Sequence, residues 1–144
     1  MAGQIGQAGA QARDAQAQAR AEGDAPALVA AVTLLGECQW RAATDRAALF
    51  AGLRTLAAGL RVAEQTGEHA DAHLLAVLSL TQAAVGSPAK AAQTAGKALG
   101  RSSPSSPGQV LALLSLGRVA EAQAAARAGE LAAGWWAWAV PGGR

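Results

Sequence analysis

The stretch AVLSLTQAAVGSPAKA at residues 76–91 has a counterpart further along the chain, ALLSLGRVAEA at residues 112–122. Both begin with a leucine-rich segment that contains a serine, and both pass through a turn glycine, Gly86 or Gly117, into an alanine-rich segment. Small residues then recur at steps of four and three, which line one face of a helix. Each copy therefore predicts two helices joined by a tight turn, with the second helix pressed closely against the first.

Capping residues and apolar spacing extend this pattern along the chain. Asp24 followed by Pro26 predicts a helix start, and Thr44 or Asp45 and then Ser87 are predicted caps of two further helices. The glycine at position 67 predicts a helix end. The expected helices cover residues 25–40, 46–65, 69–85, 88–99, 109–116 and 119–129.

Three segments fall outside these helices. Residues 1–22 are rich in glutamine, alanine and glycine, and we expect either a polar helix over residues 8–22 or a disordered arm. Residues 100–108 are rich in serine and proline, which predicts a loop inside a helical domain spanning 24–140. Residues 141–144 are expected to form a tail.

The composition supports an all-α fold. Of 144 residues, 41 are alanine and 17 are glycine, whereas the β-branched and aromatic residues that favour strands are scarce. Alanine and leucine are the strongest helix formers. This composition argues against a β-sandwich, a barrel or a central parallel sheet.

The glycine and alanine spacing resembles the tetratricopeptide repeat (TPR) family. The segment Leu-Gly-Arg-Val-Ala-Glu-Ala at 116–122 is most similar to its pattern, and the resemblance covers roughly residues 24–131. Leu-Arg-Val-Ala-Glu-Gln-Thr-Gly-Glu at 60–68 resembles the variant of about 40 residues per repeat found in bacterial signalling and transcriptional regulators of the maltose-activator type. The resemblance implies antiparallel hairpins stacked as a short right-handed solenoid of about six or seven helices. Another stack or bundle of helical hairpins is the alternative.

The resemblance also implies a binding groove. In TPR proteins the first helix of each pair lines a concave groove that receives a segment of a partner. Aligning Gly86 with the family's turn assigns His73 and Leu80 to groove positions, and a fainter earlier copy assigns Glu37 and Trp40. Trp40 could instead fill the core beside the leucines of its own helix.

Three tryptophans near the end of the chain form an unusual cluster, Trp135, Trp136 and Trp138. Neighbouring residues on a helix point about 100° apart, so one helix face cannot bury all three rings. The rings could cap the last hairpin, or form a surface for self-association or for a partner. Shallow membrane contact is a third alternative.

The polar residues do not suggest an enzyme. His69 and His73 are four apart and share a helix face, but no third metal ligand is evident, and exposed histidines are the simpler interpretation. The single Cys38 has no partner that would mark it as a nucleophile, so we expect a buried thiol that packs as a small hydrophobic group. No catalytic residue, cofactor or metal is predicted.

Charge and hydropathy limit the partners. The net charge of +2 is spread along the chain, which argues against nucleic acid, and no segment is long and apolar enough to span a membrane. No signal peptide is evident, so we expect a cytoplasmic protein, and the arginine-, alanine- and glycine-rich composition suggests a bacterial one. The leading hypothesis is a non-enzymatic interaction module that binds a protein segment or its own copy, as an adaptor or scaffold. The alternative is a regulatory domain, linked to transcription, that binds a small-molecule effector.

Overall fold

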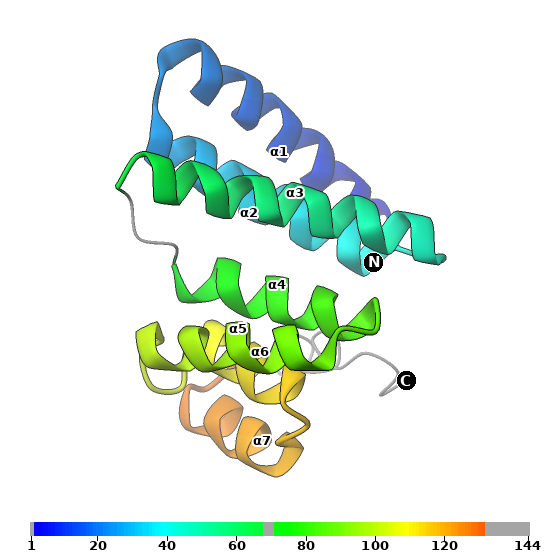
Figure 1. The fold of residues 1–144 in the computed structure, drawn as a ribbon, viewed down its shortest axis with the longest axis vertical. Coiled ribbons are helices and arrows are strands. Elements are labelled where there is room, and N and C mark those ends of the chain that lie inside the picture. Colours follow the sequence, from blue (N-terminus) through cyan, green and yellow to red (C-terminus); the bar gives the residue numbers. More distant parts are fainter. Residues whose placement is uncertain (1, 68–70, 132–144) are drawn as a thin grey trace. The chain divides into compact units, whose positions relative to one another are not determined.

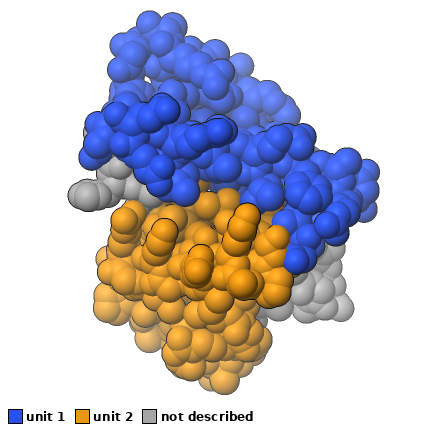
Figure 2. Space-filling model, in the orientation of Figure 1, with its two compact units in different colours: residues 1–70, 84–86 blue, residues 71–83, 87–144 orange. Residues whose placement is uncertain are grey.

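The computed structural model describes residues 2–67 and 71–131, and within them it is entirely helical (Figure 1). This confirms the predicted all-α class. The helices are α1 (Ala2–Glu22), α2 (Ala25–Ala42), α3 (Arg46–Gln65), α4 (Ala72–Ala84), α5 (Pro88–Arg101), α6 (Pro107–Ser115) and α7 (Val119–Ala128). The chain divides into two compact units (Figure 2). Unit 1 comprises Met1–Ala70 and Ala84–Gly86, and unit 2 comprises Asp71–Ala83 and Ser87–Arg144.

Side-chain caps fix the starts of α2 and α3 where the sequence predicted them. The Asp24 carboxylate accepts a hydrogen bond from the Ala27 amide at 3.1 Å, and Asp45 accepts one from the Ala48 amide at 2.8 Å. The prediction that the Ser87 side chain caps a helix is wrong. Ser87 occupies the N-cap position of α5 but makes no side-chain cap bond. Its ψ of 67° lies outside the extended region from which a capping side chain reaches the first turn.

In unit 1, α2 contacts both α1 and α3. Residues 2–22 form a helix, which is the ordered one of the two alternatives weighed from the sequence. The side of α1 with little or no side chain, at Gly9, Ala12 and Ala19, is buried. A Cβ atom built on Gly9 would lie 3.8 Å from the Cβ atom of Cys38 on α2. The missing side chains therefore let a polar helix lie close to an apolar one.

The contact between α2 and α3 is closer still. A Cβ atom on Gly36 would lie 2.5 Å from Cγ of Leu56, which is completely buried. On the opposite helix, a Cβ atom on Gly52 would lie 3.3 Å from the backbone nitrogen of Trp40. Leu56 is buried, whereas the other leucines at helical spacing on the same side of α3, Leu49, Leu53 and Leu60, are half-buried.

In unit 2, α4 and α6 run side by side in the same direction. The Ser79 hydroxyl donates a hydrogen bond to the Ser115 hydroxyl at 2.9 Å, and a Cβ atom on Gly108 would lie 3.4 Å from Cβ of Ala72. Residue numbers differ by 36 in both pairs, so each contact joins equivalent positions of the two similar sequence segments. Helix α6 has nine residues, whereas α4 has thirteen. Because α6 is shorter, the turn glycines that follow the two helices, Gly86 and Gly117, are fewer than 36 residues apart.

The second helices, α5 and α7, bury alanine. Ala91, Ala95 and Ala98 of α5 are buried, as are Ala122 and Ala126 of α7. The alanines of α7 pack with Val110 and Leu113 of α6 in one apolar cluster. Ala89 and Ala120, near the starts of the same two helices, are exposed. Each is two positions before a buried alanine, which turns it about 200° away from the contact.

The contact at Gly36 gives a first prediction. In the Gly36→Ala variant the new methyl group would overlap the buried Leu56 side chain, and we expect unfolding free energy to fall by about 1–3 kcal/mol. The matched control is Gly6→Ala in α1, where a Cβ atom would have no neighbour within 4 Å. This control should gain about 0.5–1 kcal/mol, because alanine favours a helix interior over glycine. Chemical denaturation measures both. Equal stability of the two variants would contradict the close contact.

Candidate functional site

A charged pair is buried on α2. The Arg41 guanidinium donates hydrogen bonds to Oε1 of Glu37, at 3.2 Å from Nε and 3.0 Å from Nη2. The Arg41 side chain is 5% exposed and that of Glu37 is 9% exposed. The guanidinium carbon also lies 4.8 Å from the centre of the Trp40 ring, within the range of a cation–π interaction. Trp40 itself is buried.

Burial makes this pair different from the surface pair Arg118–Glu121 on α7, whose side chains are 46% and 58% exposed. Loss of water lowers the pKa of Arg41, while the neighbouring Glu37 carboxylate acts in the opposite direction and raises it. The Glu37 carboxylate therefore offsets part of the cost of burying the Arg41 guanidinium. The Glu37 carboxylate and the Trp40 ring both contact the guanidinium, and all three side chains belong to the same helix.

Glu37 and Arg41 belong to the face of α2 that lies between its two neighbours. Gly36 faces α3 and Cys38 faces α1, so the residue between them points between those helices. Steps of three and four place five residues on this face, which we call the α2 face: Ala27, Ala30, Leu34, Glu37 and Arg41.

The α2 face changes character along its length. Ala27, Ala30 and Leu34 are exposed, whereas the Glu37 and Arg41 side chains are buried. Leu34 is 43% exposed, and among the described residues only Val119, at 44%, is another large apolar side chain left so open to solvent. An exposed apolar strip therefore ends at a buried charged pair.

Cys38 packs beside this face rather than on it. Its free thiol is buried and lies near Gly9 of α1. Burial raises the pKa of Cys38, and the charge of Glu37 raises it further, while Arg41 and Arg13 act in the opposite direction. The thiol is therefore neutral at pH 7, which confirms the sequence interpretation of Cys38 as a small hydrophobic group.

The residues predicted for the groove fall in different places. Glu37 and Trp40 meet in unit 1 through their shared contact with Arg41. His73, half-buried, and Leu80, buried, belong to α4 and to unit 2. The tryptophans predicted as a cap or an interface lie outside the described residues: Trp135, Trp136 and Trp138.

Sequence reasoning missed Arg41 and Leu34. Arg41 could have been found, because an acidic residue followed four positions later by a basic one is a recognisable helix pair. Leu34 carries a weaker signal. Two adjacent leucines at 34 and 35 cannot share one helix face, but the spacing alone does not say which of them is exposed.

Across residues 2–67 and 71–131, no three histidine, cysteine, aspartate or glutamate side chains come together as metal ligands would. None of the helices described is both long and apolar enough to cross a membrane.

Comparison of the chain with protein-family models found no match, and neither curated proteins nor solved structures gave one.

The buried pair gives a second prediction. Arg41→Gln removes a hydrogen-bonded positive charge from beside the buried Glu37 carboxylate, and we expect the free energy of unfolding to fall by about 3 kcal/mol. The matched control Glu121→Gln breaks the exposed pair on α7 and should change stability little. Urea denaturation of the two variants measures the difference, and an Arg41→Gln protein as stable as the control would rule out a buried pair.

Cys38 gives a third prediction, in pH dependence. Because the pKa of the folded thiol is raised, the unfolded chain releases this proton first as pH rises. The stability that depends on the neutral thiol is complete below about pH 8.5 and is lost as pH rises above it. Unfolding free energy should therefore fall more steeply above this pH in the native protein than in Cys38→Ala. Parallel curves for the two proteins would show that the folded thiol ionises normally.

Proposed function

We propose that this chain is a non-enzymatic protein-interaction module that binds a segment of a partner protein along the α2 face. The observation that supports it is Leu34, a large apolar side chain exposed on a helix whose two sides are already occupied by α1 and α3. An apolar side chain in this setting gains free energy when a partner removes it from water. It can then act as the anchor of a binding surface.

The other residues of the α2 face indicate which kind of partner segment would fit. Ala27 and Ala30 lack long side chains, so a partner side chain can approach the helix beside Leu34. The buried pair of Glu37 and Arg41 ends the apolar strip and is held rigidly by its hydrogen bonds and by Trp40. A partner segment with one or two apolar residues, followed by a polar residue at the charged end, matches this surface.

The order of helices supports a wider version of the proposal. Helices α2, α4 and α6 are each followed by a short connection and a second helix. The parallel pair α4 and α6, in contact at positions 36 residues apart, is what stacked TPR-like hairpins would produce. In such a stack the first helices carry the binding surface, and α2 is a first helix. The proposal also retains an adaptor or scaffold role, and the bacterial origin and cytoplasmic location inferred from the sequence.

The test compares two large apolar residues with similar exposure, Leu34 and Val119. Proteins captured by the immobilised chain are quantified by mass spectrometry for the native protein, for Leu34→Gln and for Val119→Gln. Leu34 and Val119 are 43% and 44% exposed, so both substitutions remove a similar exposed apolar group. We expect Leu34→Gln to lose the specific partner at least about tenfold, the effect of about 1.4 kcal/mol, and Val119→Gln to retain it.

Two results would contradict the proposal. Equal capture by Leu34→Gln and the native protein would remove the α2 face as a binding surface. Equal loss in both variants would show that exposed apolar area, and not the α2 face, determines capture. Mass measurement in solution at several concentrations reports whether a second copy of the chain is the partner, in which case Leu34→Gln should shift the dimer towards monomer.

A further inference from the structure

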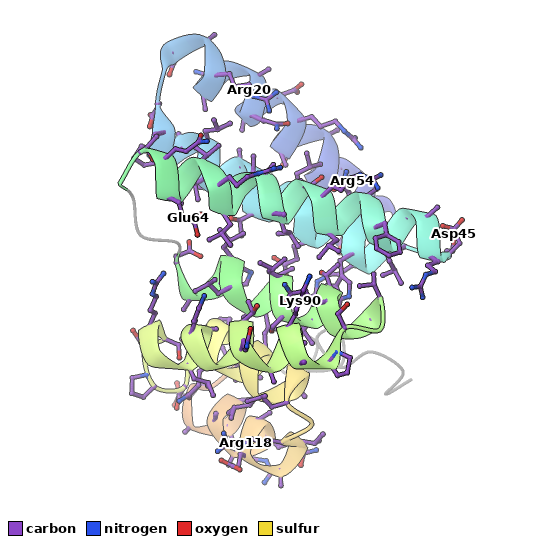
Figure 3. The ribbon with its side chains drawn as sticks, in the orientation of Figure 1. Arg20, Asp45, Arg54, Glu64, Lys90 and Arg118 are labelled. Atoms are coloured by element: carbon purple, nitrogen blue, oxygen red, sulfur yellow. The ribbon has the colours of Figure 1, made fainter. Side chains whose placement is uncertain are left out.

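Helix α5 carries a row of basic residues on its exposed side. Lys90 and Lys97 are seven residues apart and Arg101 follows four residues later, so all three share one helix face (Figure 3 labels Lys90). All three are exposed, whereas the alanines at 91, 95 and 98 face the interior of unit 2. We call Lys90, Lys97 and Arg101 the α5 row.

Acidic residues are absent from this part of the chain. The sequence has no aspartate or glutamate between Asp71 and Glu121, a stretch that includes all of α4, α5 and α6. The nearest acid beyond α6, Glu121, is hydrogen-bonded to Arg118. No ion pair found among the described residues includes Lys90 or Lys97. These two charges therefore stand without a neutralising carboxylate from their own or the neighbouring helix.

We propose that the α5 row docks an acidic helical segment of a partner protein. Lys90 and Lys97 are separated by about 10 Å along the helix axis, the rise of seven residues at 1.5 Å each. Carboxylates seven residues apart on a second helix have the same separation, so a helix lying along α5 pairs with both lysines at once. Charge complementarity of this kind directs association and sets the register of the two helices.

The surface beside the row leaves room for such a helix. Gly96 and Gly100 are exposed on α5 directly before Lys97 and Arg101, about 100° around the helix from them, and a Cβ atom built on either glycine would have no neighbour within 4 Å. A second backbone can therefore come near α5 without meeting a long side chain, and the lysines can reach its carboxylates.

Other anionic partners fit less well. A helix that lies in a membrane surface presents large apolar residues to the lipid. On α5 the only one is Leu99, which is partly buried against the apolar cluster of α6 and α7. Strong nucleic-acid binding uses many phosphate contacts, whereas the α5 row offers three cations.

The α5 row belongs to unit 2 and the α2 face belongs to unit 1, so this proposal does not depend on the function proposed for Leu34. The probe is a labelled alanine-based helical peptide of about 20 residues with glutamates seven apart, and its twin with glutamine at those positions. Fluorescence anisotropy at low salt measures the affinity of the full chain for each peptide. We expect the glutamate peptide to bind more tightly, and the difference to shrink as salt is added.

Charge variants make the test specific. Removing both charges in Lys90→Gln/Lys97→Gln should weaken binding of the glutamate peptide about three- to tenfold, and Lys90→Arg/Lys97→Arg should retain it. The matched control is Arg13→Gln/Arg20→Gln on α1, which removes two exposed cations with the same spacing and should leave the affinity unchanged. Circular dichroism verifies that each variant is folded.

Three results would overturn the proposal. The first is equal binding of the glutamate and glutamine peptides. The second is an equal loss of affinity in the α1 control, which would mean that net charge alone attracts the peptide. The third is tighter binding of another anion to the α5 row. In that case vesicles of phosphatidylserine and phosphatidylcholine, or a single-stranded oligonucleotide, would displace the peptide at a concentration lower than that of the peptide. The Leu34→Gln variant should bind the glutamate peptide normally, so failure of the α2 face and failure of the α5 row are separable.

Discussion

The absence of a side chain at Gly36 is the constraint on which unit 1 depends. Leu56 of α3 fills the space that a Cβ atom at this position would take, and Gly52 admits the backbone of α2 from the other side. The distance between α2 and α3 is therefore set by the contact of the Leu56 side chain with the backbone at Gly36. Because Gly9 and Ala12 of α1 make a similarly thin contact on the opposite side, α2 is enclosed by two close neighbours. Only a narrow strip of α2, the face with Leu34, is left open between them.

Thin contacts of this kind bury little apolar area, and area is what stabilises a core. Among residues 2–67 and 71–131, the largest completely buried side chains are Leu56 in unit 1 and Leu74 and Leu111 in unit 2, so each unit has its own buried leucine. The high glycine content has two origins. Gly36, Gly52 and Gly108 lie where a neighbouring helix is in contact, whereas Gly6, Gly96 and Gly100 have open space around them. Packing within this chain gives no reason for the second group, although glycine weakens a helix interior.

The sequence predicted local features well and orientation less well. Asp24, Asp45 and the glycine at position 67 marked helix ends correctly because capping depends on a few neighbouring residues. The leucines that share a face of α3 are only partly buried, because periodicity identifies a face but not how much of it a neighbour covers. Leu34 was missed for the same reason. Glu37 and Trp40 were assigned to groove positions, and in the structure both contact Arg41, which that assignment did not include.

The chain uses charge in two opposite ways. Arg41 on α2 is buried and neutralised by Glu37, an arrangement that well-packed apolar residues could replace without loss of stability. Stability therefore does not explain why the chain has this pair. A role in ending the apolar strip of the α2 face would explain it. On α5, Lys90 and Lys97 are exposed in a stretch without acids, where they add nothing to the core. If both proposals hold, one chain presents an apolar anchor in unit 1 and a cationic row in unit 2, and each selects a different kind of segment. Two surfaces with such different chemistry suit a protein that brings two partners together better than one that holds a single ligand.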